Sequence, residues 1–198
     1  VGSMGRDGRI GQAKEAAKRI VSTLTVSDRV AIVPFSDDAS QAITNNGYLF
    51  RATDENKQLL VNEIDQLDAI GQTNFDAAFQ RVFRIFEDSI SNELHIECNS
   101  AILFLTDGES QCNGCRSDAE VIDYVSNQTN AISKEIGHPI LLFSYSISDD
   151  PLVEAFPSSL ACAVDVGVWQ KIEKSEDIID ALSSYYRLFA LGIGGGES

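Results

Sequence analysis

The sequence has little positive charge and no long hydrophobic run. Its 198 residues contain 15 Lys and Arg against 30 Asp and Glu, which gives a formal net charge of −15. Nucleic acids and anionic membrane surfaces are bound through basic patches, so we expect neither as a partner. No stretch approaches the roughly 20 apolar residues that a membrane-spanning helix needs. We therefore expect no direct membrane insertion by this domain.

The sequence also lacks the motifs of common enzyme classes. No Gly-x-Gly-x-x-Gly follows a strand-like segment, and no Gly-x-x-x-x-Gly-Lys-Ser/Thr loop occurs. There is no Gly-x-Ser-x-Gly nucleophile elbow. The Gly-rich run at 192–196 follows an expected helix, which is the wrong context for phosphate binding. These absences favour a binding module that is not an enzyme.

What the sequence does contain is an alternation of strand-like and helical patterns. Helices are expected over Arg9–Leu24, Asp54–Leu67 with Asp54 as its cap, Phe75–Ile90 capped by Thr73 or Asn74, 117–136 starting at Ser117 or Asp118, Pro151–Ala161 and Ser175–Leu191. Strands are expected over Arg29–Phe35, Gln41–Thr44 at an edge, Ala101–Thr106, Pro139–Ile147 and Val166–Ile172, with a turn at 45–47. The Phe residues of the third helix and Trp169 are expected in the core. This order predicts an α/β fold with a doubly wound, mostly parallel sheet flanked by helices. We expect one domain over residues 1–191, and a Gly-rich linker over 192–198 that leads to a following domain.

Asp107 is the most informative residue for function. It follows the strand Ser100 to Thr106, which carries no charge and is therefore expected to be a central parallel strand covered on both faces. The carboxyl edge of such a sheet is where open α/β folds bind ligands. The segments 2–5 and 71–74 each precede a helix and can reach the same edge. Carboxylate and hydroxyl oxygens gathered there suit Mg²⁺, with Ca²⁺ or Mn²⁺ as variants.

These residues resemble the metal-ion-dependent adhesion site (MIDAS) of von Willebrand factor A-type domains, and the resemblance covers nearly the whole chain. Ser3 matches the last Ser of the family's Asp-x-Ser-x-Ser motif, Thr73 its Thr, and Asp107 the Asp after the hydrophobic strand. The resemblance implies that these three residues bind the ion. Val1 stands where the family has its first Ser, and valine offers no oxygen, so we expect weakened binding. The family's first Asp, and the first strand that carries it, are expected to precede residue 1.

Each of these residues also has a structural reading. Ser3 could cap the first helix, Thr73 could cap the third, and Asp107 with Gly108 could form an ordinary turn. Four further carboxylates that follow expected strands are interpreted as solvated loop residues: Asp37, Asp38, Asp149 and Asp150. The three candidate ligands at one sheet edge, in the family's order, favour the metal site.

The four cysteines fall on two sides of the expected sheet. Cys98 precedes the strand that ends at Thr106, whereas Cys112 and Cys115 follow it, and the strand spans about 20 Å, which a disulfide cannot bridge. We therefore predict a Cys98–Cys162 bridge and a local Cys112–Cys115 bridge. An even count favours an oxidising, extracellular compartment. Two alternatives stay open: isolated thiols in a cytosolic protein, and a zinc half-site at 112–115, which lacks a second Cys pair.

Two further segments suggest a particular branch of the family. Residues 97–108 and 160–163 resemble the A domain of the alpha-2-delta subunits of voltage-gated calcium channels. That resemblance implies an extracellular module of a membrane-associated protein, whose metal site engages an acidic side chain of the channel pore subunit. Asn127 begins a glycosylation sequon, consistent with an extracellular glycoprotein. The alternatives are a cell-surface or matrix adhesion domain and an intracellular scaffold of an ATPase complex.

Overall fold

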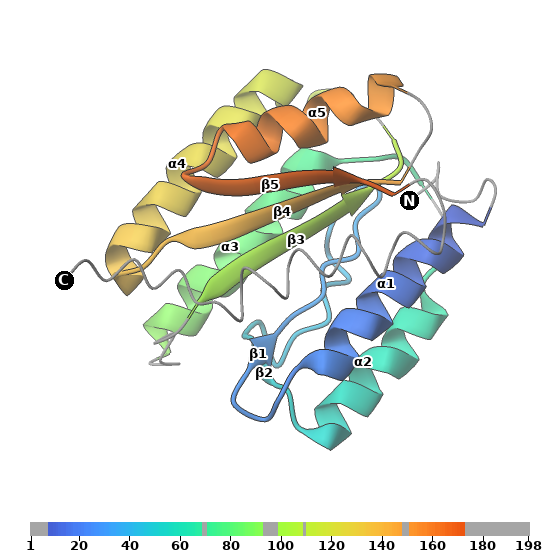
Figure 1. The fold of residues 1–198 in the computed structure, drawn as a ribbon, viewed down its shortest axis with the longest axis vertical. Coiled ribbons are helices and arrows are strands. Elements are labelled where there is room, and N and C mark those ends of the chain that lie inside the picture. Colours follow the sequence, from blue (N-terminus) through green and yellow to red (C-terminus); the bar gives the residue numbers. More distant parts are fainter. Residues whose placement is uncertain (1–7, 69–70, 93–98, 109, 148–150, 173–198) are drawn as a thin grey trace.

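The computed structural model describes residues 8–68, 71–92, 99–108, 110–147 and 151–172. Its helices are α1 (Arg9–Thr23), α2 (Asp54–Gln66), α3 (Phe75–Ser91), α4 (Asp118–Ile136) and α5 (Pro151–Cys162). Its strands are β1 (Arg29–Val30), β2 (Phe50–Arg51), β3 (Ser100–Thr106), β4 (Ile140–Ser146) and β5 (Val166–Lys171). Helices and strands alternate from α3 to β5, as Figure 1 shows. Among the described residues, no helix combines the length and apolarity that crossing a membrane requires.

The sheet confirms the predicted α/β class. β3, β4 and β5 run parallel in the order β3-β4-β5, with Ser100 opposite Ile140 and Leu141 opposite Val166. β1 and β2 form a separate antiparallel pair. Parallel neighbours require helical crossovers, which α4 and α5 supply.

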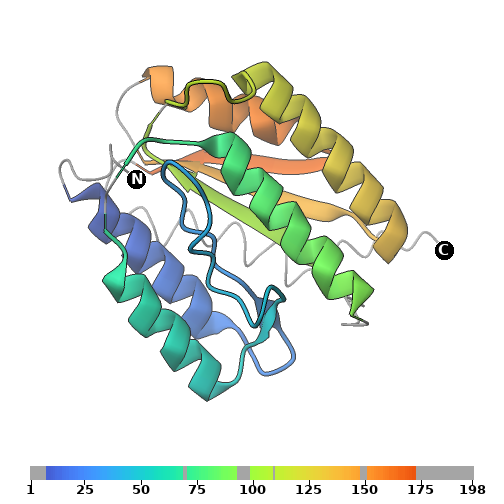
Figure 2. The same ribbon diagram turned by 180° about the vertical axis from the view of Figure 1, so that it is seen from behind.

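Helices cover both faces of the parallel sheet. On one face α3, α4 and α5 pack against Ile102, Phe104 and Leu142, and the expected Phe stripe of α3 lies in this core. On the other face α1 packs against the odd-numbered residues of β4, such as Phe143 and Tyr145. Viewed from behind, α3 crosses the sheet while α1 and α2 lie side by side (Figure 2). All seven residues of β4 are therefore buried, because a helical layer covers each face of the sheet.

Several local expectations need correction. The strand expected over Arg29–Phe35 shortens to β1, and that at Gln41–Thr44 reduces to one bridge between Ile32 and Ile43. Pro34 explains part of this, because it has no N–H to donate to a ladder. Thr53, rather than Asp54, caps α2 by accepting from the Asn56 N–H.

Trp169 is not a core residue. It is 36% exposed, and its indole N–H donates to the Ser146 hydroxyl at 2.9 Å. β5 is an edge strand among the described residues, so its side chains are covered less completely than those of β4.

Other local expectations are confirmed. Asn46 and Gly47 both have positive φ, 53° and 96°, as a tight hairpin-type turn at 45–47 requires. Ser117 caps α4 in a capping box with Glu120. The helix expected over Ser175–Leu191 and the linker over 192–198 lie outside the described residues, so the proposed domain boundaries stay predictions.

Candidate metal site at the carboxyl edge of the sheet

Asp107 lies directly beyond the carboxyl end of β3 and is only 3% exposed. The Arg9 guanidinium, at the start of α1, lies 3.5 Å from an Asp107 carboxylate oxygen. An ordinary surface turn would leave an Asp in water, whereas this carboxylate is buried and compensated by a cation. The edge of the sheet therefore holds a negative charge that favours a positive partner.

Thr73 lies in the loop before α3 and is 4% exposed. It does not cap the helix, because Asn74 does so by accepting from the Ala77 N–H at 2.9 Å. No hydrogen bond of the Thr73 hydroxyl is found among the described residues. Its oxygen is thus available for another role, as the metal-ligand reading requires.

The loops that carry Thr73 and Asp107 are joined by main-chain contacts. The Gln111 N–H donates to the Thr73 carbonyl at 2.8 Å, and the Ser110 hydroxyl lies 3.4 Å from the same oxygen. The structure therefore brings the two loops together, as the sequence predicts from their place at one edge.

Asp37 holds the Thr73 loop in place, a role that the sequence did not reveal. Its carboxylate accepts from the Gln72 N–H at 3.0 Å, while its carbonyl accepts from the Asn74 side chain at 2.9 Å. Gly71 has φ +82°, and a Cβ there would lie 2.6 Å from an Asp37 carboxylate oxygen. A glycine is needed at this position for both conformation and space. Asp37 is exposed, as expected, but it also fixes the loop.

The neighbouring Asp38 accepts hydrogen bonds from within its own turn. The Ser40 backbone N–H and hydroxyl both donate to its carboxylate, which lowers the pKa of Asp38. The Asp38 carboxylate therefore stabilises its own turn. Asp38 is an exposed loop residue, as the sequence predicts.

A second cluster stiffens the loop that follows Asp107. Burial raises the pKa of Asp76, but hydrogen bonds from Gln80 and Arg116 outweigh it and leave the pKa below its usual value. Arg116 also lies over the Tyr124 ring, 4.4 Å from its centroid. Beside Arg116, Cys112 and Cys115 form a disulfide with their Cα atoms 5.7 Å apart. The loop is thus anchored to both α3 and α4.

The other expected residues fall in different places. Ser3 and Val1 lie outside the described residues, although the α1 cap position is held by Gly8 and so is not Ser3. Cys162 is exposed and forms no disulfide within the described part of the chain; its expected partner Cys98 lies outside that part, so the bridge stays a prediction. Asn127 is exposed on α4, where glycosylation also stays a prediction. The sequence did not mark Arg9 as a site residue, because its role depends on Asp107, which is remote in sequence.

The donors at this edge fit a hard divalent cation. Asp107 supplies a buried anionic oxygen and Thr73 a hydroxyl oxygen, and both are ligand types that Mg²⁺ accepts. Within the described part of the chain, no cluster of three His, Cys, Asp or Glu side chains could hold a metal. The candidate site needs no such cluster, because its ligands would be one carboxylate and hydroxyl groups.

These features define a class of protein, the doubly wound α/β domain with a buried carboxylate at the carboxyl edge of its sheet. The chain belongs to the von Willebrand factor type A domain family, which matches residues 2–109 and so includes Ser3, Thr73 and Asp107. This is a family of protein-interaction and adhesion modules, whose members often bind divalent metals.

Solved structures show the same fold. A von Willebrand factor type A protein from Catenulispora acidiphila is 20% identical with a TM-score of 0.67, and the match covers 93% of this chain and 39% of that one. The pilus adhesin SpaC from Lactobacillus rhamnosus GG is 13% identical with a TM-score of 0.64, covering 94% of this chain and 29% of that one. The chain thus spans well under half the length of either relative, and the likeness shows the fold alone. A search of the curated proteins found no match.

Proposed function

We propose that this domain is an extracellular, divalent-metal-dependent protein-binding module that does no catalysis. The observation that carries the proposal is the buried Asp107 carboxylate, which is held at the carboxyl edge of the sheet and compensated by Arg9 at 3.5 Å. Thr73 supports it, because its buried hydroxyl is not used as a helix cap. Ser3 is the third proposed ligand, by its match to the family motif.

The chain's own residues would bind and orient. Asp107 would provide the anionic ligand and Thr73 a neutral one, while the Asp37 contacts hold the Thr73 loop in position. When bound, Mg²⁺ would supply a coordination position that an acidic side chain of the partner can complete. Val1 contributes no oxygen, so the affinity of this site would be weaker than that of a site with a full ligand set. Dependence on a partner carboxylate would then be correspondingly strong.

The extracellular setting is supported by the Cys112–Cys115 disulfide, since such bonds persist in oxidising compartments. The same disulfide disfavours the alternative of an intracellular scaffold in an ATPase complex. The resemblance of residues 97–108 to the alpha-2-delta group favours a channel pore subunit as the partner, in a membrane-associated protein. Adhesion to a cell-surface or matrix protein is the second candidate, supported by the fold likeness to a pilus adhesin.

The test uses two labelled peptides that differ only in one side chain, Asp in one and Asn in the other. We expect the Asp peptide to bind in Mg²⁺ and to dissociate when EDTA is added, whereas the Asn peptide should not bind in either condition. Equal binding of both peptides, or binding that EDTA does not change, would contradict the proposal.

A further inference from the structure

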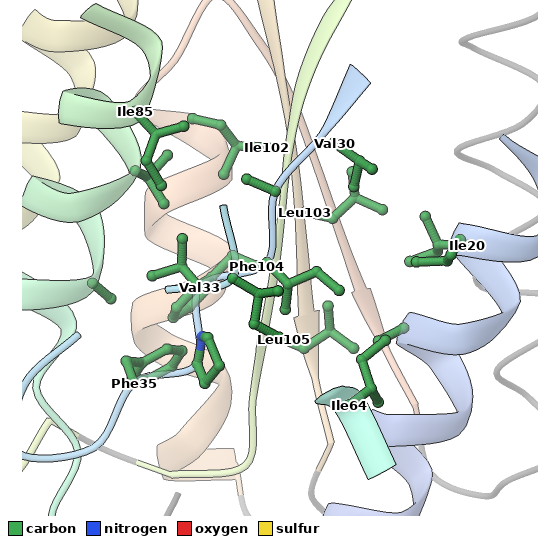
Figure 3. A pocket seen from close by; sticks show the side chains of 18 of the residues that line it. Ile20, Val30, Val33, Phe35, Ile64, Ile85, Ile102, Leu103, Phe104 and Leu105 are labelled. Atoms are coloured by element: carbon green, nitrogen blue, oxygen red, sulfur yellow. The ribbon is translucent and has the colours of Figure 1, made fainter. Parts of the chain in front are cut away.

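Two Asn-Gly pairs occur in the sequence, one at Asn46 and one at Asn113. Both asparagines are exposed on loops, and neither lines the apolar cavity that lies beside β3 (Figure 3). Asparagine is a chemically labile residue, and a glycine after it leaves its side-chain amide open to attack by the next peptide nitrogen. The reactivity of each pair therefore depends on what the fold does with that nitrogen.

The first pair lies in a tight turn, where its peptide nitrogen is engaged. The Gly47 N–H donates to the Thr44 hydroxyl at 3.0 Å. Around it, Asn45 and Tyr48 exchange both of their backbone hydrogen bonds, at 2.9 and 3.0 Å. Before the Gly47 nitrogen could attack the Asn46 side chain, its hydrogen bond to Thr44 would have to break. The fold therefore hinders reaction at Asn46.

The second pair lies at the centre of the ring that the Cys112–Cys115 disulfide closes. Within the described part of the chain, no hydrogen bond involves the Gly114 N–H or the Asn113 side chain. Gly114 has φ +83°, and apart from its chain neighbours no atom lies within 4 Å of a Cβ built on it. The attacking nitrogen and the amide that it would attack are thus both unengaged and open to water.

The flanks of this ring are fixed beside the candidate metal site. On one side the Gln111 N–H donates to the Thr73 carbonyl at 2.8 Å. On the other side Arg116 forms an ion pair with Asp76, and Ser117 caps α4. A charge added at the centre of the ring would therefore lie on a loop that contacts the Thr73 loop.

We propose that Asn113 is a site of spontaneous deamidation, with water as the co-reactant. The Gly114 nitrogen loses its proton to a base in solution and attacks the carbonyl carbon of the Asn113 side chain. The bond between that carbon and the amide nitrogen breaks, ammonia leaves, and a cyclic succinimide is formed. Water then opens either of the two carbonyl–nitrogen bonds of the succinimide. One product has aspartate at position 113, and the other has isoaspartate, in which the main chain runs through the side-chain carbonyl carbon.

Either product adds a carboxylate, and thus a negative charge at neutral pH, to the loop beside the candidate metal site. Isoaspartate also lengthens the main chain of the Cys112–Cys115 ring by a methylene group. The modification goes beyond the proposed function, and it requires neither a metal ion nor a protein partner.

The test incubates the whole 198-residue chain at neutral and at mildly alkaline pH and follows both pairs by mass spectrometry. Reduction and peptic digestion in acid stop the reaction before analysis, and the replacement of –NH2 by –OH is read as a mass increase. We expect Asn113 to deamidate at least about tenfold faster than Asn46. The rate at Asn113 should rise with pH, because the attacking nitrogen must lose its proton.

Two controls separate the effect of the fold from the intrinsic chemistry of Asn-Gly. In guanidinium chloride with the disulfide reduced, the fold no longer distinguishes the two pairs, so their rates should agree within about twofold. In the folded Thr44→Val variant, the Gly47 N–H loses its acceptor, so Asn46 should deamidate several-fold faster than in the parent.

Three outcomes in the parent chain would overturn the proposal. One is the absence of deamidation at Asn113 in the folded chain. Another is deamidation of Asn46 at a rate equal to or above that of Asn113. The third is a difference between the pairs that persists in the unfolded chain, since sequence rather than structure would then set it. An unchanged rate at Asn46 in Thr44→Val would contradict the protection assigned to the Thr44 hydroxyl. The comparison of the two pairs in the parent chain needs no variant, so it stays decisive if Thr44→Val fails to fold.

Discussion

Asp107 and Arg9 show how one buried charge can define a site. The carboxylate is 3% exposed and would be strongly unfavourable without a cation, and Arg9 provides that cation in the structure. A metal ion bound by the same carboxylate would compete with the guanidinium for it. We therefore expect Arg9 both to stabilise the metal-free domain and to oppose metal binding.

Arg9→Gln tests this pairing. We expect the variant to bind Mg²⁺ several-fold more tightly, because the competing positive charge is gone. Without metal, its free energy of unfolding should fall by about 1 to 3 kcal/mol, since Asp107 loses a charged partner. Calorimetric titration and urea unfolding measure the two effects. Arg19→Gln, at an exposed position of α1, should change neither, and a loss of affinity in Arg9→Gln would contradict the account.

Asp76 gives a prediction about pH. Its pKa is lowered in the folded state, so its contribution to stability is present above the ordinary carboxyl pKa of 3.8 and is lost as the pH falls through the lower folded value. Asp76→Asn should therefore be about 1 to 3 kcal/mol less stable than the parent at pH 7, with the difference shrinking below about pH 4. Urea unfolding at a series of pH values measures it. A difference that stays constant down to pH 2 would contradict the proposed ionic contacts.

At the scale of elements, the helices could be predicted from the sequence because their signals are local. The apolar stripe of Arg9–Leu24 predicts α1 almost to the residue, and Ser117, one of the two expected starts of α4, is its cap. The segment 29–35 could not be predicted as well, since its neighbours decide whether an extended segment becomes a ladder. Among the described residues, this segment forms only the short β1–β2 pair and the single bridge between Ile32 and Ile43.

The candidate site residues also divide into those that a local sequence pattern marks and those that depend on distant contacts. Asp107 could be found because a charge-free strand precedes it, and Thr73 because it precedes a helix signal. The roles of Arg9 and Asp37 could not be found, because they rest on contacts with Asp107 and Gln72 that lie far away in sequence. No local pattern marks such contacts.

The close approach of α5 and β5 gives a prediction at this scale. A Cβ at Gly167 would lie 1.9 Å from the Ala161 carbonyl oxygen, so the helix end and the strand could not keep their positions. We expect Gly167→Ala to lower the free energy of unfolding by about 1 to 3 kcal/mol. Gly11→Ala in α1 is the matched control, because nothing lies within 4 Å of its added Cβ. That control should raise stability by about 0.5 to 1 kcal/mol. Urea unfolding distinguishes the two, and equal effects would contradict the packing described.

At the scale of the whole molecule, distant parts of the chain meet at the carboxyl edge of the sheet. Asp107 follows β3, and Arg9 at the start of α1 reaches its carboxylate. The Thr73 loop is joined to the segment after Asp107, because the Gln111 N–H donates to the Thr73 carbonyl. The high negative charge of the chain would add a general attraction for cations.

The most direct test of the central claim is a calorimetric titration of Mg²⁺ into the domain, with Ca²⁺ and Mn²⁺ in parallel. The account predicts one binding site that Asp107→Ala abolishes and that the exposed-site control Asp123→Ala retains. Circular dichroism of each variant checks that the fold is intact. Binding that survives in Asp107→Ala, or no binding in the parent domain, would contradict the assignment of this sheet edge as a metal site.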